Sequence, residues 1–207
     1  MTFYDYLVKQ YGFDSAIFLS ELSFKEYSLP WLKKELARLC KEGKACRFEK
    51  GVYYLPTETI FGKSVLDPRE ILIKKYIKSE NEVYGYFSGV TFMNMLCLST
   101  QMPNTLEVYT NKEKTRVREI TIGSLKYILR RSRTTINREN AATMSFLELM
   151  NFTPGYFYDD EKRKIVTEYI KENQITRGMV KAYSPYFPDK ALRTLVESGI
   201  VYNLLRK

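Results

Sequence analysis

The feature that most constrains the fold is a leucine repeat at helical spacing, followed directly by a segment in which apolar and polar residues alternate. Four leucines fall within one arc of a helical wheel: Leu29, Leu32, Leu36 and Leu39. Ser28 precedes the repeat as a candidate N-cap, and Pro30 is tolerated because first-turn amides have no intrahelical partner. The repeat therefore predicts an amphipathic helix that runs to Glu42 and ends at Gly43.

Residues 1–56 as a whole predict a winged helix-turn-helix. Apolar spacing over residues 3–11 predicts one short helix, and Asp14 is placed to cap another over residues 15–22. After the leucine repeat, alternation over residues 44–55 predicts a β-hairpin. Three short helices and a hairpin are the order of the winged fold, in which the third helix enters the major groove and the hairpin lies along the DNA backbone.

The chain of 207 residues is long enough to favour two domains. Residues 57–68 contain a glycine, a proline and little periodicity, so they are predicted to connect the winged helix to a C-terminal domain over residues 69–207. The sequence thus predicts an α+β protein: an N-terminal winged helix-turn-helix followed by a mixed α/β C-terminal domain with an antiparallel sheet and a helical tail.

Helices and strands are both predicted in the C-terminal domain. Two helices come first, over residues 67–77 and 88–96. Three strands follow, over residues 105–110, 115–122 and 125–133, the first two around a turn at 111–114. Four helices complete the tail, over residues 144–150, 160–172, 176–183 and 188–198.

Net charge points to a polyanionic partner, because a formal charge of +9 favours nucleic acid through counterion release. The predicted third helix carries cations on the face opposite its leucines, and two more flank the hairpin turn. The candidate DNA-binding residues are Lys33, Lys34, Arg38, Lys41, Arg47 and Lys50. Trp31 is predicted to contact phosphate or to pack against a neighbour. The alternative for the cations is an ordinary solvated helix face.

A second basic concentration lies outside the predicted winged helix. Residues 105–140 hold nine cations against four acids, a net +5, whereas residues 1–56 hold nine against seven, a net +2. The nine cations are Lys112, Lys114, Arg116, Arg118, Lys126, Arg130, Arg131, Arg133 and Arg138. Strand alternation places Arg116 with Arg118 on one face, and Arg131 with Arg133. Such a surface is predicted to bind DNA backbone, RNA or an acidic protein; the alternative is ordinary exposed strand charge.

Enzymatic chemistry has little support in the sequence. The chain contains no histidine, which removes the commonest general base and metal ligand, and no glycine-rich phosphate loop is present. We therefore expect no enzyme, no metal and no cofactor. The acidic cluster Asp159, Asp160 and Glu161 begins a predicted helix, where the helix dipole explains it, although a carboxylate enzyme stays as a minor hypothesis.

Cellular location and cysteine redox state are predicted from the lack of targeting segments and from the number and spacing of the cysteines. No signal peptide or apolar run of about 20 residues is found, so a cytoplasmic protein without a membrane span is expected. Cys40, Cys46 and Cys97 form no C-x-x-C pair, and an odd number of cysteines favours buried thiols over a disulfide frame.

Two blocks of sequence resemble the AbiEi family of abortive-infection antitoxins. Residues 36–56, LARLCKEGKACRFEKGVYYLP, are similar to the end of the recognition helix and the wing of that family. Residues 85–103, GYFSGVTFMNMLCLSTQMP, resemble its next block, which opens with G-Y-x-S-G and ends with T-Q-x-P. Cys97 stands where the family pattern has glycine, which puts the tightness of that helix end in doubt.

The resemblance implies an antitoxin of a type IV toxin–antitoxin system that serves in phage defence. Such a protein binds double-stranded operator DNA through the winged helix and represses its own operon. Its C-terminal domain neutralises a nucleotidyltransferase-like toxin without necessarily forming a stable complex with it. The alternative hypothesis is a winged-helix protein-interaction module with an RNA-binding C-terminal domain.

Overall fold

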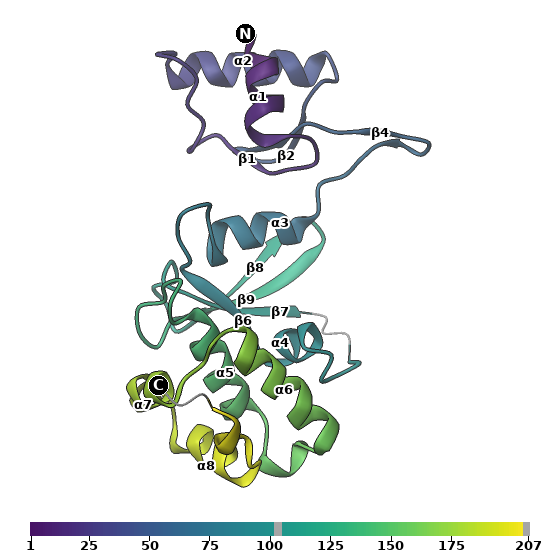
Figure 1. The fold of residues 1–207 in the computed structure, drawn as a ribbon. Coiled ribbons are helices and arrows are strands. Elements are labelled where there is room, and N and C mark those ends of the chain that lie inside the picture. Colours follow the sequence, from purple (N-terminus) through teal and green to yellow (C-terminus); the bar gives the residue numbers. More distant parts are fainter. Residues whose placement is uncertain (102–104, 205–207) are drawn as a thin grey trace. The chain divides into compact units, whose positions relative to one another are not determined.

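The computed structural model describes residues 1–101 and 105–204 and is a mixed α and β protein (Figure 1). The chain divides into two compact units, residues 1–74 and residues 75–207. The division falls inside the helix predicted over residues 67–77, so the predicted connector and the first part of that helix belong to the first unit.

Two helices of the first unit form as the periodicity predicts. Helix α1 (Phe3–Tyr11) begins with a capping box between Thr2 and Asp5, and Gly12 follows it with a φ of 70°. Helix α2 (Leu29–Lys41) places its leucine face in the core, although the side chain of Ser28 makes no capping hydrogen bond. The core residues are Phe3, Leu7, Ile17, Leu22, Phe24, Leu32, Leu36, Leu39, Ala45 and Leu55.

The predicted middle helix over residues 15–22 is wrong, because Ile17–Phe18 forms a short strand, β1. This strand pairs antiparallel with β3 (Val52–Tyr54), and both of its side chains are buried. Asp14 adopts a φ of 54°, and its carboxylate accepts hydrogen bonds from Thr57 and Ser64 instead of capping a helix. Pairing with a distant segment therefore overrides the weak local helix signal.

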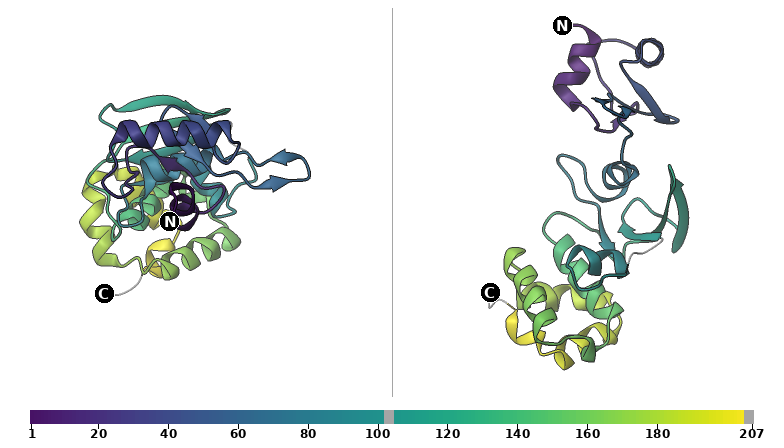
Figure 2. Two further views of the ribbon diagram at one scale, coloured as in Figure 1. Left: turned by 90° about the horizontal axis from the view of Figure 1, so that it is seen from above. Right: turned by 90° about the vertical axis from the view of Figure 1, so that its right-hand side faces the viewer.

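The hairpin predicted after α2 is present. Strand β2 (Cys46–Glu49) pairs antiparallel with β3, and the sheet has the order β1-β3-β2. A second, smaller hairpin of β4 (Glu58–Thr59) and β5 (Gly62–Lys63) lies within the predicted connector and projects from this unit (Figure 2). The base of the projection is tied to the unit by the hydrogen bonds of Asp14, and Lys63 donates to the carbonyl of Gly43.

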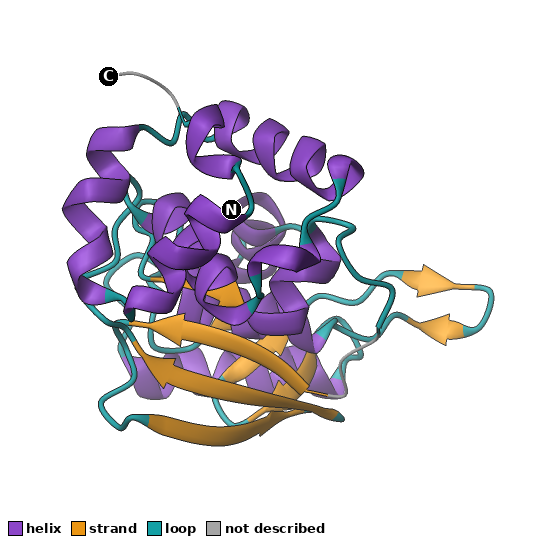
Figure 3. Ribbon diagram, turned by 90° about the horizontal axis from the view of Figure 1, so that it is seen from below, coloured by secondary structure: helices purple, strands orange, loops and turns teal. Residues whose placement is uncertain are grey.

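The second unit contains a four-stranded mixed sheet, not the antiparallel sheet that was predicted (Figure 3). Strands β7 (Thr105–Thr110) and β9 (Leu125–Arg131) run parallel, whereas β8 (Val117–Ile122) pairs antiparallel with β9. Strand β8 pairs with β9 because the two-residue loop Gly123–Ser124 joins them in a tight hairpin. Strand β7 then pairs with the other edge of β9, in parallel. Strand β6 (Gly85–Ser88), which was not predicted, pairs with β7 and completes the order β6-β7-β9-β8.

The predicted helices of the remaining chain are present with small changes at their ends. The helix over residues 67–77 begins as α3 (Pro68–Leu72) and continues as a π-helical stretch, Ile73–Ile77. The others are α4 (Gly89–Met95), α5 (Ala141–Phe152), α6 (Asp160–Glu172), α7 (Arg177–Tyr183) and α8 (Asp189–Glu197). Residues 143–150 of α5 are all buried, so this helix is the centre of the core of the second unit.

The resemblance block at residues 85–103 corresponds to β6, α4 and the turn after them, apart from Met102 and Pro103, which lie outside the described residues. Cys97 has a φ of 57°, a left-handed conformation that favours glycine. The amide of Leu98 nevertheless donates to the carbonyl of Met93 at 2.8 Å. The end of α4 is therefore tight in spite of the cysteine.

The three thiols are free. Cys40 and Cys46 are half-buried, but Cys97 is exposed, so the expectation of buried thiols is wrong at that position. Cys97 occupies the turn after α4, where the backbone follows the surface and offers no core to enter.

Candidate nucleic-acid interface

The cations predicted on α2 and the β2–β3 hairpin are all exposed. Four of them form neither an ion pair nor a side-chain hydrogen bond within residues 1–101 and 105–204: Lys33, Lys34, Lys41 and Lys50. Their ammonium groups are therefore available to phosphate oxygens. The leucine face of α2 fixes their direction, because burial of Leu32, Leu36 and Leu39 turns the opposite face outward.

Arg38 differs from its lysine neighbours because two glutamates hold it. Its Nη2 lies 2.8 Å from Oε2 of Glu35, and its Nη1 pairs with Glu42. These hydrogen bonds raise the pKa of Arg38, the one that it donates to Glu35 most. The charge of Arg38 is therefore offset by neighbouring carboxylates, although such exposed pairs exchange easily because water competes for both groups.

The β2–β3 hairpin places two further cations beside its turn. The Nε of Arg47 donates to the backbone carbonyl of Glu49 at 3.3 Å, which holds the guanidinium along the strand. Lys50 lies in the turn itself, before Gly51, whose φ of 82° lets the chain reverse. The hairpin thus presents its cations at the end of the sheet that follows α2.

Trp31 packs within the unit. Its ring lies 3.9 Å from that of Tyr27 between centroids, in a stacked arrangement, and it also contacts Phe3 and Phe24. Of the two predicted roles for Trp31, the structure favours packing. The aromatic cluster stabilises the segment that leads into α2.

Five of the nine cations in the second basic group, by contrast, are engaged within the described part of the chain, three of them in ion pairs. Arg118 pairs with the buried Glu113 at 2.8 Å, Arg130 pairs with Glu107, and Arg133 pairs with Glu148. Lys112 lies 3.6 Å from the ring centroid of Tyr84, and Arg138 donates to the carbonyl of Glu80. The remaining four cations form no ion pair in the described part of the chain: Lys114, Arg116, Lys126 and Arg131.

Those four do not share one face of the sheet. Lys126 and Arg131 lie five positions apart on β9, so alternation places their side chains on opposite faces. Arg116 precedes β8 and Lys114 lies in the turn after β7. A single continuous basic surface over residues 112–138 is therefore not formed.

Arg133 is half-buried and packs against the core of the second unit. Its guanidinium lies 5.0 Å from the ring centroid of Phe187 and 5.7 Å from that of Tyr109, and its Nε donates to Glu148 at 2.9 Å. The hydroxyl of Tyr109 also donates to Glu148. Burial and the nearby carboxylate of Glu148 raise the pKa of Tyr109 to about 12. This cluster is a structural network between the sheet and α5.

The acidic cluster at residues 159–161 is explained by the start of α6. The side chain of Asp159 caps the helix by accepting from the amide of Lys162, and Asp160 pairs with Arg163 at 2.6 Å. No group of three histidine, cysteine, aspartate or glutamate side chains in the described ranges is placed to hold a metal ion.

Sequence reasoning missed the partners of the arginines. The spacing of Glu35 and Glu42 from Arg38, three and four residues, is a detectable signal for helical ion pairs. The partner of Arg133 had no such signal, because the pair forms only when α5 packs on the sheet.

Within residues 1–101 and 105–204, none of the helices has the length and apolar character that a membrane span requires. No family model matches the chain, and no curated protein or solved structure matches it either.

Proposed function

We propose that the first unit is a winged-helix-type DNA-binding module and that the protein is an antitoxin that represses its own operon. The observation that carries the proposal is the row of unpaired lysines on α2, Lys33, Lys34 and Lys41, followed along the chain by the cationic β2–β3 hairpin. A helix that presents cations outward suits the major groove, and the hairpin suits contacts to the adjacent backbone.

The arrangement of the first unit supports this assignment in part. We take α2 as the recognition helix, because its leucine face packs into the core and its outer face carries the unpaired lysines. Strand β1 holds the hairpin by pairing with β3, so the wing cannot swing independently of the sheet. The unit departs from the helix-turn-helix order at residues 15–22, where strand β1 and a turn stand in place of the predicted middle helix.

The affinity for operator DNA is expected to fall steeply with salt. If the cations of the first unit neutralise about six phosphates, the slope of log affinity against log salt is roughly −5. Fluorescence anisotropy with a labelled duplex from the region upstream of the gene measures this slope. A flat response to salt would remove the DNA-binding proposal.

The antitoxin half of the proposal rests on the resemblance to the AbiEi family at residues 36–56 and 85–103. Co-expression with the neighbouring gene is expected to restore growth that the neighbour alone arrests. The full chain with the lysines of α2 substituted should still restore growth, because the proposed antitoxicity lies in the second unit, residues 75–207. Growth arrest that persists with the wild-type protein at equal expression contradicts the antitoxin assignment.

A further inference from the structure

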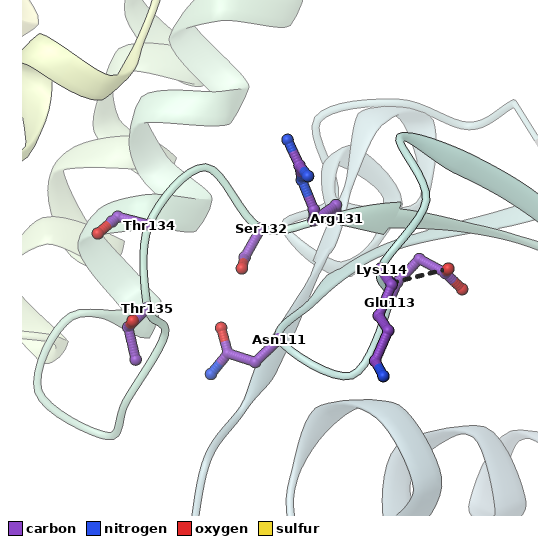
Figure 4. Close-up of a pocket in the computed structure, with 7 residues that line it drawn as sticks. All are labelled: Asn111, Glu113, Lys114, Arg131, Ser132, Thr134 and Thr135. Atoms are coloured by element: carbon purple, nitrogen blue, oxygen red, sulfur yellow. Dashed lines mark hydrogen bonds between the residues drawn. The ribbon is translucent and has the colours of Figure 1, made fainter.

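A polar pocket of about 490 Å³ lies in the second unit, beyond the ends of β7 and β9 (Figure 4). It is lined by Asn111, Glu113, Lys114, Arg131, Ser132, Thr134 and Thr135. The residues come from two segments: the turn after β7 and the chain that leaves β9. None of the lining residues is apolar, which excludes the usual pocket for a lipid or an aromatic ring.

The parallel pairing of β7 and β9 creates this pocket. Both strands end on the same side, with Thr110 beside Arg131, and the two chains then diverge. Crevices outside the carboxyl ends of parallel strands are common ligand sites for this reason. The amide of Ser132 donates to the carbonyl of Thr110 at 3.2 Å, so the divergence begins from a fixed point.

A side-chain bridge also fixes the distance between the two walls. The amide group of Asn111 donates to the carbonyl of Ile136 at 2.7 Å and accepts from the amide of the same residue at 2.9 Å. These two bonds connect the turn after β7 to the segment before α5. The pocket is therefore built before any ligand enters, which lowers the entropy cost of binding.

The charge inside the pocket favours an anion. Lys114 and Arg131 come from the two lining segments and form no ion pair with any described residue. Figure 4 draws their charged ends pointing away from one another, but both side chains are exposed and therefore free to turn toward a ligand. The buried carboxylate of Glu113 is already neutralised, because it pairs with Arg118 and accepts from the amides of Lys114 and Thr115. Burial would raise the pKa of Glu113, but the hydrogen bonds from Thr115 and Arg118 lower it overall, so the carboxylate stays ionised and paired.

The hydroxyl groups of the pocket add neutral donors. Ser132, Thr134 and Thr135 make no side-chain hydrogen bond within the described ranges, so their hydroxyls are available to a ligand. Figure 4 shows Ser132 and Asn111 pointing toward one another across the space. Two cations together with three hydroxyls match the many acceptor oxygens of a phosphate group.

We propose that this pocket binds the phosphoryl groups of a small phosphate ester or anhydride. This activity goes beyond the proposed operator binding, which uses the first unit. The pocket volume exceeds that of a single phosphate, and Lys114 and Arg131 can each turn toward a separate phosphoryl group because neither is held by an ion pair among the described residues.

Isothermal titration calorimetry on the full chain in magnesium-free buffer tests the proposal, with inorganic pyrophosphate, adenosine 5′-triphosphate and adenosine as probes. Pyrophosphate and the triphosphate are expected to bind, and adenosine is not. Lys114→Gln and Arg131→Gln should each weaken pyrophosphate binding about tenfold, since each removes one charge-assisted hydrogen bond. Arg116→Gln and Lys126→Gln change the net charge equally outside the pocket, and each should alter affinity less than about twofold in screening salt.

A variant without any charge change keeps the test independent of net charge. The double substitution Ser132→Ala with Thr134→Val should weaken pyrophosphate binding at least threefold while the melting temperature is retained. Absence of binding to the wild-type chain overturns the proposal. An equal loss in all four charge variants also overturns it, because diffuse surface charge would then explain the binding.

Operator duplex provides the last arm of the experiment. Arg131→Gln is expected to leave duplex affinity within about twofold, because the pocket belongs to the second unit. A loss of duplex affinity as large as the loss for pyrophosphate would assign the pocket to nucleic-acid backbone and overturn the small-molecule proposal. Failure of duplex binding in the wild-type chain, with pyrophosphate binding intact, would instead remove only the operator proposal.

Discussion

Replacing Lys33 and Lys34 together with glutamate is expected to weaken operator binding by at least about a hundredfold at 0.15 M salt. Both lysines are exposed on α2 and unpaired among the described residues. Loss of two phosphate contacts accounts for roughly thirtyfold, because each contributes about 0.9 to the salt slope, and the new carboxylates add repulsion. The slope itself should fall from about −5 to about −3.5. Fluorescence anisotropy across a salt series measures both quantities.

Two controls separate the face of α2 from general charge. Lys164→Glu with Lys171→Glu reverses two exposed lysines of α6, in the second unit, and is expected to change affinity less than about threefold, since charges outside the proposed interface are screened by salt. Arg38→Gln combined with Glu35→Gln should also have a small effect, because the pair of substitutions removes one charge of each sign from the ion-paired cluster. If the α2 variant binds duplex as well as the wild type, the alternative of a protein-interaction module replaces the DNA-binding proposal.

Local signals were sufficient to predict α1, α2 and the β2–β3 hairpin. Each depends on residues close in the sequence: a capping residue, a leucine repeat, or alternation around a short turn. Strand β1 was missed because two buried residues, Ile17 and Phe18, become a strand only by pairing with Val52 and Tyr53. No periodicity within a segment this short distinguishes a strand from a helix.

The mixed sheet shows the same limit over a longer range. Alternation predicted β7, β8 and β9 as strands. Which strands pair depends, however, on whether the loop between β7 and β8 or the loop between β8 and β9 forms the tighter turn. The two-residue loop at Gly123 pairs β8 with β9, and β7 then joins the other edge of β9 in parallel. The phosphate pocket follows from this pairing, so it had no signature in the sequence.

The sequence shows how many positive charges the chain carries, but it does not show which of them are free to bind a ligand. Within residues 105–140, the counting gave a net +5 and suggested one basic surface. The fold instead buries Glu113 and Glu148 beside arginines and separates the unpaired cations between two faces. A charge contributes to a binding surface only when no acidic neighbour within the fold has neutralised it.

Replacing Arg133 with methionine is expected to destabilise the second unit by roughly 3–5 kcal/mol, because the change leaves a buried carboxylate without its counter-ion. Glu148 is 6% exposed and, among the described residues, would keep only the hydroxyl of Tyr109 and the side-chain amide of Asn151 as partners. Urea denaturation followed by circular dichroism measures the free energy of unfolding. The exposed arginine on the neighbouring strand end, Arg131, provides the matched control: Arg131→Met should cost less than about 0.5 kcal/mol.

Adding Glu148→Gln to Arg133→Met should recover at least about 1 kcal/mol, since a neutral amide needs no counter-ion yet still accepts from Tyr109. Recovery identifies the buried charge, and not lost packing against Phe187, as the main cost. A loss below about 1 kcal/mol for Arg133→Met alone would mean that the guanidinium is dispensable to the core. Arg133 would then return to the cations available for a ligand, and the division between structural and binding charge in this unit would have to be redrawn.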